Sequence, residues 1–411
     1  MFCHQPHHLP IRKLELIVLL SLGSLSSAIL ADEAMPVVPT VASSLEALVP
    51  VGWKLESKVE GDLNRDQLPD VALTLTEKSK LPDNPDFDVT RRLLVLALRQ
   101  KDGSWQRSAV SDRAALNSDE GGIWGDPFEE IRIERGALVI EHFGGSNWRW
   151  GITSRYRFQD NQWTLIGRTD SNSFTNDPEY RDDADRNFST GQVIREFTAA
   201  QGSDLLSERE KRMSKQPKVS YRQIPAPFSK IAPDLNGDAA SGEWPKQALK
   251  LNRADHVITP PQTWTGPADS SATLRAVCTS GALFVIAEVS DDHPSPEDRL
   301  RLTDLNGVEI KPTNQARVNQ PSGYVVELSW SRASLIAALP RSDGVWLDPA
   351  PIEETDSTIE AELPLVLELL DVDQGQPRST LSTRPKGAQY SAAILIMDPE
   401  EFVLTGGSDK P

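Results

Sequence analysis

Alternating apolar and polar positions dominate the C-terminal half of the chain. Apolar side chains recur at every second residue in 272–278 and 282–289, and Tyr324, Val326, Leu328 and Trp330 share one face of 323–330. Residues 363–370 and 390–397 add two further runs. A period of two residues is typical of strands with one buried face. Several such runs between proline-rich loops predict an antiparallel β-sandwich over residues 229–405.

Residues 43–198 are also strand-rich, but some of their apolar runs do not alternate. Residues 93–98 are apolar throughout, as expected for a strand covered on both faces. Predicted strands at 137–142, 148–158 and 163–167 follow, separated by Gly- and Asn-rich turns. A short helix at 43–48 would make this domain α+β rather than all-β. The predicted fold class is therefore mainly β, with a strand-rich N-terminal domain and a C-terminal sandwich.

Residues 199–228 have a different composition from the segments on either side. Glutamate, lysine and arginine dominate 207–218, and Pro217, Pro225 and Pro227 interrupt the segment. Little of it can be buried, so we expect an interdomain linker containing a short charged helix.

The first 31 residues have the layout of a secretory signal peptide. Arg12 and Lys13 precede a mostly apolar run from Leu16, and small residues at 26–31 offer cleavage sites. A membrane anchor is the alternative, but this run is interrupted and shorter than the roughly 20 residues that span a bilayer. The sequence thus predicts a periplasmic or secreted protein with no membrane span in the mature chain.

Charge and cysteine content narrow the choice of partners. The chain has 43 Lys and Arg against 60 Asp and Glu, a formal net charge of −17. That balance disfavours nucleic acid and anionic membrane as partners. Once Cys3 leaves with the signal peptide, Cys278 has no intramolecular disulfide partner. The three remaining histidines are scattered, which argues against a zinc site.

The segment 61–70 has the spacing of a calcium loop. Asp62, Asn64, Asp66 and Asp70 occupy positions 1, 3, 5 and 9, and a predicted strand follows at once. Ca²⁺ takes six to eight oxygen ligands, which alternate residues of a tight loop can supply. The segment resembles the calcium loops of FG-GAP and VCBS-like repeats. It departs from them at the sixth position, where Gln67 replaces the usual glycine. An Asp- and Asn-rich turn without metal is the alternative.

A second distinctive region contains paired glycines. Residues 121–129 (GGIWGDPFE) and 142–150 (HFGGSNWRW) flank a predicted hairpin. With the calcium-type loop, they resemble a group of small exported bacterial proteins that are themselves functionally uncharacterised; the resemblance covers about residues 45–200. Asp126, Glu129, His142 and Arg149 could line a cleft there, or they could cap turns around core tryptophans. No nucleophile–base pair is visible.

The C-terminal half resembles family 9 carbohydrate-binding modules. The blocks that carry the resemblance are 234–238 with 242–245, then 264–272 (WTGPADSSA), 283–292 (LFVIAEVSDD) and 324–328 (YVVEL). The resemblance implies a β-sandwich, calcium in some members and sugar binding in others. We interpret 234–238 as the opening turn of the sandwich.

Candidate ligand residues follow from this resemblance and from side-chain chemistry. Pyranose rings stack on exposed aromatic rings. Trp264, Tyr324 and Trp346 are therefore the candidates for binding glycan. Asp291, Asp292 and Asp298, in an acidic loop at a predicted strand end, are candidates for a second metal site.

The functional expectation is an exported, non-catalytic binding protein. Ca²⁺ is its expected cofactor, and a polysaccharide or cell-envelope glycan is its expected ligand. Two alternatives remain: a carboxylate-dependent glycan hydrolase, which would need two acids at set separations, and a structural or interaction protein of the cell envelope. No G-x-S-x-G sequence, Cys/His pairing or phosphate loop is present.

Overall fold

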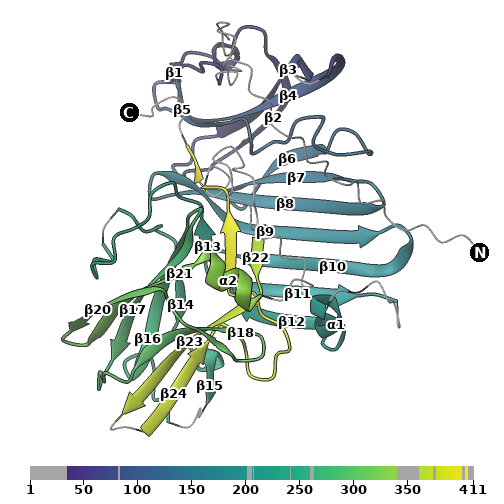
Figure 1. The fold of residues 1–411 in the computed structure, drawn as a ribbon. Helices are drawn as coiled ribbons and strands as arrows, with labels where there is room; N and C mark the ends of the chain where they lie inside the picture. Colours follow the sequence, from purple (N-terminus) through teal and green to yellow (C-terminus); the bar gives the residue numbers. More distant parts are fainter. Residues whose placement is uncertain are drawn as a thin grey trace, which may run out of the picture. The chain divides into compact units, whose positions relative to one another are not determined.

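A computed structural model describes the chain at residues 35–81, 84–200, 206, 208–240, 242–259, 263–339, 361–373, 376–399 and 403–405. The fold is mainly β, as predicted, with antiparallel strands in almost every pairing (Figure 1). The α-helices among these residues are the short α1 (Glu208–Ser214) and α2 (Arg332–Ala338). None of the described helices is long and apolar enough to cross a membrane.

Two sheets form the first part of the chain. The first has five antiparallel strands in the order β1 (Val41–Ala42), β5 (Trp105–Ser111), β4 (Asn84–Arg99), β3 (Asp70–Leu81) and β2 (Lys54–Gly61). The second runs β12 (Lys218–Arg222), β11 (Gln192–Thr198), β10 (Asp177–Asn187), β9 (Gln162–Phe174), β8 (Trp148–Gln159), β7 (Ala137–Gly145) and β6 (Phe128–Glu134). Strand β26 (Val403–Leu404) pairs with β9 as its eighth member.

These two sheets share a hydrophobic core. Leu94 and Leu96 of β4 belong to the same buried cluster as Leu138 and Ile140 of β7. Residues 93–97 of the apolar run are buried on both sides, as the lack of alternation predicts, and Leu98 is partly buried. Leu404 of β26 lies in the same cluster, so β26 packs against these two sheets.

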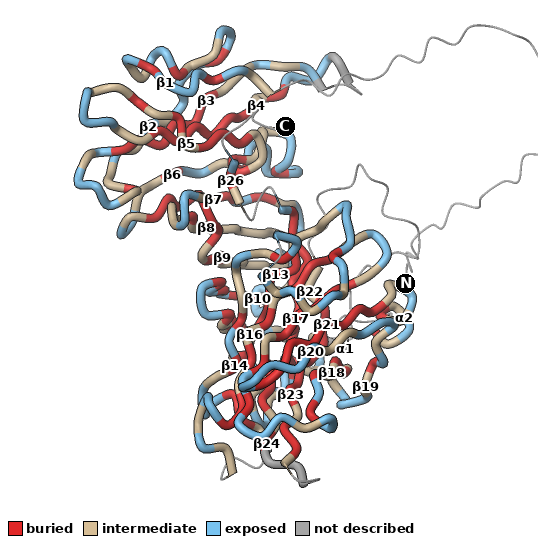
Figure 2. The backbone as a smooth tube through the Cα atoms, turned by 90° about the vertical axis from the view of Figure 1, so that its left-hand side faces the viewer, coloured by how far each residue is buried: buried red, intermediate tan, exposed pale blue. Residues whose placement is uncertain are grey.

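The predicted sandwich is formed by two five-stranded sheets. One runs β14 (Leu249–Leu251), β16 (Ser270–Cys278), β17 (Ala282–Asp291), β21 (Gly323–Ser331) and β20 (Asn314–Gln320). The other runs β15 (Val257–Thr259), β24 (Gln376–Ser382), β23 (Leu365–Asp373), β18 (Arg299–Asp304) and β19 (Glu309–Ile310). Their alternating apolar residues form one buried cluster, seen as red segments inside both sheets in Figure 2.

The structure corrects the predicted linker at residues 218–227. Strand β12 pairs with β11, and β13 (Ile224–Pro227) pairs in parallel with β25 (Ile394–Met397), whose other neighbour is β22 (Ala361–Leu363). Val219 and Tyr221 alternate with polar residues and are buried. Only two apolar residues take part in this alternation, and charged residues and prolines surround them. The local composition therefore does not predict a strand. The charged helix expected in this segment is α1.

Candidate metal centre

At one end of the sandwich, the core-facing positions of three strands continue into aspartates. Val289 of β17 is followed two residues later by Asp291, and Leu369 of β23 by Asp371. Asp298 stands two residues before Leu300, at the start of β18. Because side chains two apart on a strand share a face, these three aspartates point into the sandwich.

The three aspartates meet in what we call the inner aspartate cluster: Asp291, Asp298 and Asp371. One carboxylate oxygen from each lies within 4.8 Å of the others. Each residue is only 2% exposed. Three ionised carboxylates in such a place repel one another and lose hydration, so the arrangement needs positive charge, protons or hydrogen bonds to persist.

Backbone groups satisfy part of this requirement. Asp291 Oδ1 accepts a hydrogen bond from the amide of His293 at 2.8 Å. Asp298 Oδ1 accepts one from the amide of Val372 at 2.8 Å, and its Oδ2 accepts one from the amide of Ser295. Asp371 Oδ2 accepts from the Ser379 hydroxyl at 3.0 Å.

Two carboxyl groups of the cluster have raised pKa values, mainly because they are buried. Burial, followed by the Asp298 charge, raises the pKa of Asp291 to about 6. Burial, with a smaller contribution from Asp291, raises the pKa of Asp371 to about 7 despite the bond from Ser379. Arg317 approaches with Nη2 3.9 Å from Asp298 Oδ2, but its guanidinium also donates to the backbone carbonyls of Ser295 and Asp298.

Two buried hydroxyl groups without hydrogen-bond partners among the described residues border the cluster. Tyr324 and Ser270 are each 1% exposed, and both side-chain oxygens lack a partner. Ser270 of β16 lies opposite Asp291 of β17. Tyr324 of β21 lies opposite Val289 of β17, so the Tyr324 ring is diagonal to Asp291 on the same face. Burial first, then the charge of Asp298, raises the pKa of the Tyr324 hydroxyl. Buried hydroxyls rarely stay unpartnered, so an additional ligand or ion would complete this site.

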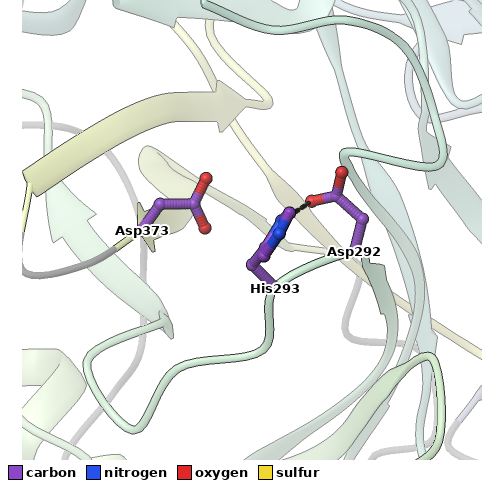
Figure 3. Close-up of side chains that lie close together, drawn as sticks. All are labelled: Asp292, His293 and Asp373. Atoms are coloured by element: carbon purple, nitrogen blue, oxygen red, sulfur yellow. Dashed lines mark hydrogen bonds and ion pairs between the residues drawn. The ribbon is translucent and has the colours of Figure 1, made fainter.

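A second group of potential ligands lies next to the inner cluster. Asp292, His293 and Asp373 have side-chain atoms within 4.8 Å of one another, and Asp292 and His293 are exposed (Figure 3). His293 Nδ1 lies 2.8 Å from Asp292 Oδ1, which raises the pKa of the imidazole. This outer group could also hold a cation, but Asp292 and His293 lie at the surface, where water hydrates them.

The predicted second metal site, Asp291, Asp292 and Asp298, is thus divided between the two groups. Asp291 and Asp298 meet in the inner cluster, whereas Asp292 points to the outer one because it is adjacent to Asp291 on the strand. Sequence reasoning missed Asp371, whose strand is about 70 residues away along the chain. The alternation Leu365, Leu367, Leu369, Asp371 was the signal that could have identified it.

The calcium-type loop at 61–70 has a different arrangement. Asp62 accepts from the amides of Asp66 and Gln67 at 3.1 and 3.0 Å, and Asp66 accepts from that of Leu68 at 2.8 Å. Asn64 Oδ1 also accepts from Asp66 N, at 3.0 Å. Gln67 has a φ of 70°, so it takes the left-handed conformation that glycine usually provides.

Asp70 is the buried carboxylate of this loop, and it joins the loop backbone to β4. It is 0% exposed, and it accepts from the amides of Leu63, Asn64 and Arg99 at 2.8, 3.2 and 2.9 Å. Among the described residues, Asp62, Asp66 and Asp70 do not form a group with carboxylate oxygens mutually within 4.8 Å. The side-chain oxygens of this loop therefore accept hydrogen bonds from backbone amides in this structure.

The three candidates for glycan binding have different surroundings. Trp264 is partly exposed, and its Nε1 donates to Ser270 O at 2.8 Å. The assignment of Tyr324 needs correction: its ring is buried, with the Arg317 guanidinium 3.7 Å from the ring centroid, so it cannot stack on a sugar. The reason is its place on the core-facing side of β21 with Val326 and Leu328. Trp346 lies outside the described residues.

No protein-family model matches the chain, and no curated protein sequence matches it.

Proposed function

We propose that the chain is an exported, non-catalytic binding protein whose C-terminal sandwich is stabilised by Ca²⁺ at the inner aspartate cluster. The observation that carries this proposal is the convergence of three carboxylates, each 2% exposed, beside two unpartnered hydroxyls. Oxygens on opposite sides of one Ca²⁺ lie about 4.6–5.2 Å apart. The 4.8 Å limit within the cluster is compatible with a shared ion.

A hard cation suits this site better than a soft one. The groups that converge are carboxylates and hydroxyls, which are the oxygen ligands that Ca²⁺ prefers. Zn²⁺ sites usually include His or Cys. The nearest histidine, His293, has its ring in the outer group. Because the three carboxylates come from β17, from the start of β18 and from β23, one ion would connect both sheets of the sandwich.

The proposed ligand class is carbohydrate. Its support is the resemblance to family 9 carbohydrate-binding modules, the sandwich itself and the partly exposed Trp264 beside the cluster. The proposed location is periplasmic or extracellular, on the strength of the signal-peptide pattern in residues 1–31.

The hydrolase alternative receives little support from the acids discussed above. Asp126 is held by Arg92, with Nη1 and Nη2 2.7 and 2.6 Å from its two oxygens. The inner cluster is too deeply buried to meet a glycosidic bond. The envelope-structural alternative differs from our proposal only in lacking a glycan ligand, so a binding experiment distinguishes the two.

Thermal unfolding with Ca²⁺ and with a chelator tests the cation site. At one hundred times Kd, a ligand stabilises the folded state by about 2.7 kcal/mol. That corresponds to a rise in Tm of roughly 5–10 °C for a domain of this size. We expect Asp298→Asn to lose the rise. Glu297→Gln, an exposed neighbour with the same loss of charge, should keep it. Identical curves for the unmodified protein in Ca²⁺ and chelator would refute the cation site.

A glycan screen with and without Ca²⁺ tests the ligand class. We expect binding to at least one polysaccharide. A screen without hits, together with an intact Ca²⁺ effect on Tm, would favour the structural alternative.

A further inference from the structure

The outward face of β8 contains three arginines that the proposed function does not use. Arg149, Arg155 and Arg157 occupy odd-numbered positions of this strand, so they share one face of the sheet. Tyr156, on the opposite face, is 2% exposed and belongs to the core that the two N-terminal sheets share. The arginines therefore point away from that core. We call them the arginine row.

Small residues of the neighbouring strands border the row. Gly167 on β9 lies opposite Arg155, and a Cβ at that glycine would come 3.2 Å from Arg186 O and 3.8 Å from Arg155 Cδ. Gly151, between Arg149 and Thr153, likewise presents no side chain. Thr169, Ser171 and Ser173 of β9 continue the same face, so hydroxyl groups border the arginines. Figure 1 shows β7, β8 and β9 side by side in this sheet.

None of the three arginines forms an ion pair with a carboxylate of the described residues. Arg155 donates to Thr169 Oγ1 at 3.0 Å. The Nε atoms of Arg149 and Arg157 have no hydrogen-bond partner within the described parts of the chain. The nearest electrostatic partner is Glu134 on β6, whose pKa is lowered first by Arg132 and to a smaller extent by Arg155.

The acids nearest to the row along the sheet are already bound. Glu141 on β7 pairs with Arg132 at 2.6 Å. Asp185 on β10 accepts from Thr169 Oγ1 at 2.9 Å. Asp183 accepts from Ser171 and pairs with Arg181. Strand β10 lies two strands from β8, about 10 Å away. The carboxylates that flank the row therefore have hydrogen-bond or ion-pair partners outside it.

An exposed aromatic group lies at one end of the row. Trp124 is 52% exposed and Phe143 is 38% exposed. The Arg149 guanidinium lies 4.4 Å from the Trp124 ring centroid, and Phe143 meets that ring edge-on at 6.3 Å. Trp124 Nε1 donates to Ser146 O at 3.3 Å. These contacts hold the indole in place without burying it, so little entropy is lost when a ring stacks on it.

We infer that the arginine row and Trp124 form a binding site for an acidic, uronate-containing polysaccharide. Guanidinium groups bind carboxylates in a bidentate manner, and an indole stacks on the C–H face of a pyranose ring. Arg149 and Arg157 are eight residues apart, which is about 26 Å along a strand. That length fits an extended polymer better than a single sugar. The negative net charge of the chain opposes any polyanion at long range, so binding depends on the short-range contacts of Arg149, Arg155 and Arg157.

This inference deepens the proposed function and depends on it only for the class of ligand, carbohydrate. The arginine row lies on β8, whereas the inner aspartate cluster lies in the sandwich. The two sites can therefore succeed or fail independently.

Affinity electrophoresis of the full chain tests the site with polygalacturonate and with the same polymer fully methyl-esterified. We expect retardation only by the acid form, and weakening at high salt because the contacts are ionic. Arg149→Gln with Arg157→Gln should weaken binding at least tenfold. Trp124→Ala should weaken it severalfold. Arg253→Gln, an exposed arginine of the sandwich segment, is the matched control and should bind normally.

Equal retardation by the esterified polymer, or unchanged affinity in the double variant, would overturn the inference. Tighter binding of single-stranded DNA than of polygalacturonate would also overturn it.

Asp298→Asn separates this site from the cation site. The first outcome is that Ca²⁺ does not raise the Tm of the unmodified protein or of Asp298→Asn, while both bind the polymer. The proposed cation site is then wrong, and the arginine row remains supported. Loss of polymer binding in Asp298→Asn alone would place the polymer on the sandwich.

Discussion

Two acidic regions of this molecule combine similar residues in opposite ways. In the loop 61–70, four oxygen-bearing side chains lie within ten residues, and they accept hydrogen bonds mainly from backbone amides of their own loop. In the inner aspartate cluster, three aspartates separated by as many as 80 residues meet inside a sandwich. The first region looks like a metal site in sequence, and the second resembles one in space.

The difference shows what a cation would contribute in each place. Each carboxylate of the loop accepts from at least one backbone amide, and burial raises the pKa of Asp70. The cluster has more negative charge than its amides and Arg317 can balance. A bound ion would therefore add little to the loop and much to the cluster.

Removing the buried loop acid should have the largest effect on stability. Asp70→Ala leaves three amides without their acceptor, each costing about 1–3 kcal/mol when buried. We expect a loss of about 3 kcal/mol or more in the free energy of unfolding, equally with Ca²⁺ and with chelator. Urea unfolding in both buffers measures it. A loss confined to Ca²⁺ buffer would show that Asp70 acts through an ion.

The pH dependence of stability should reveal the cluster. Asp291 and Asp371 have folded-state pKa values of about 6 and about 7, above the usual value. The folded state thus binds more protons than the unfolded chain. In chelator, the contribution of these two groups to the free energy of unfolding should be greatest below about pH 4. It should fall as the pH rises to about 7, by at most about 1.4 kcal/mol per pH unit for each group. Ca²⁺ should remove most of this fall.

Urea unfolding at several pH values, with Asp371→Asn as the comparison, checks this prediction. The variant should show a flatter profile in chelator. A profile in chelator that is identical in the two proteins would argue that the cluster does not titrate in this range.

Tyr324→Phe should separate folding from ion binding. Its hydroxyl has no hydrogen-bond partner among the described residues, so its removal leaves no broken bond. We expect stability in chelator to change by less than about 1 kcal/mol. Ca²⁺ affinity should fall severalfold if the hydroxyl contacts the ion or its water. Calorimetric titration measures the affinity. A variant that binds Ca²⁺ normally and is strongly destabilised in chelator would contradict this role.

Asp66→Ala should have the smallest effect. Asp66 is exposed and accepts from the amide of Leu68 at 2.8 Å, so we expect a loss of about 0.5–1.5 kcal/mol in unfolding free energy. The Ca²⁺-dependent rise in Tm should remain. A variant that loses this rise would show that the loop is itself a calcium site, and the contrast between the two regions would disappear.

Much of the fold could be predicted from the sequence because alternation is a local property. The runs at 272–278, 282–289 and 323–330 are strands β16, β17 and β21, and their apolar faces form the sandwich core. The pairing of β26 with β9 could not be predicted, since a two-residue strand at the end of the chain leaves no periodic signal.

The candidate site was predictable only in part. Asp291 and Asp298 lie in one acidic loop, so local reading identified them. Asp371 joins them through the pairing of β18 with β23, which depends on the tertiary fold. Tyr324 was assigned to glycan from its residue type, although its alternation with Val326 and Leu328 already placed it in the core.

Calorimetric titration with Ca²⁺ of two double variants tests the central claim most directly. One is Asp298→Asn with Asp371→Asn, and the other is Asp62→Ala with Asp66→Ala. The account predicts that the first loses the tightest Ca²⁺-binding event and the second retains it with unchanged affinity. Retention in the first and loss in the second would contradict the assignment of the metal centre to the sandwich.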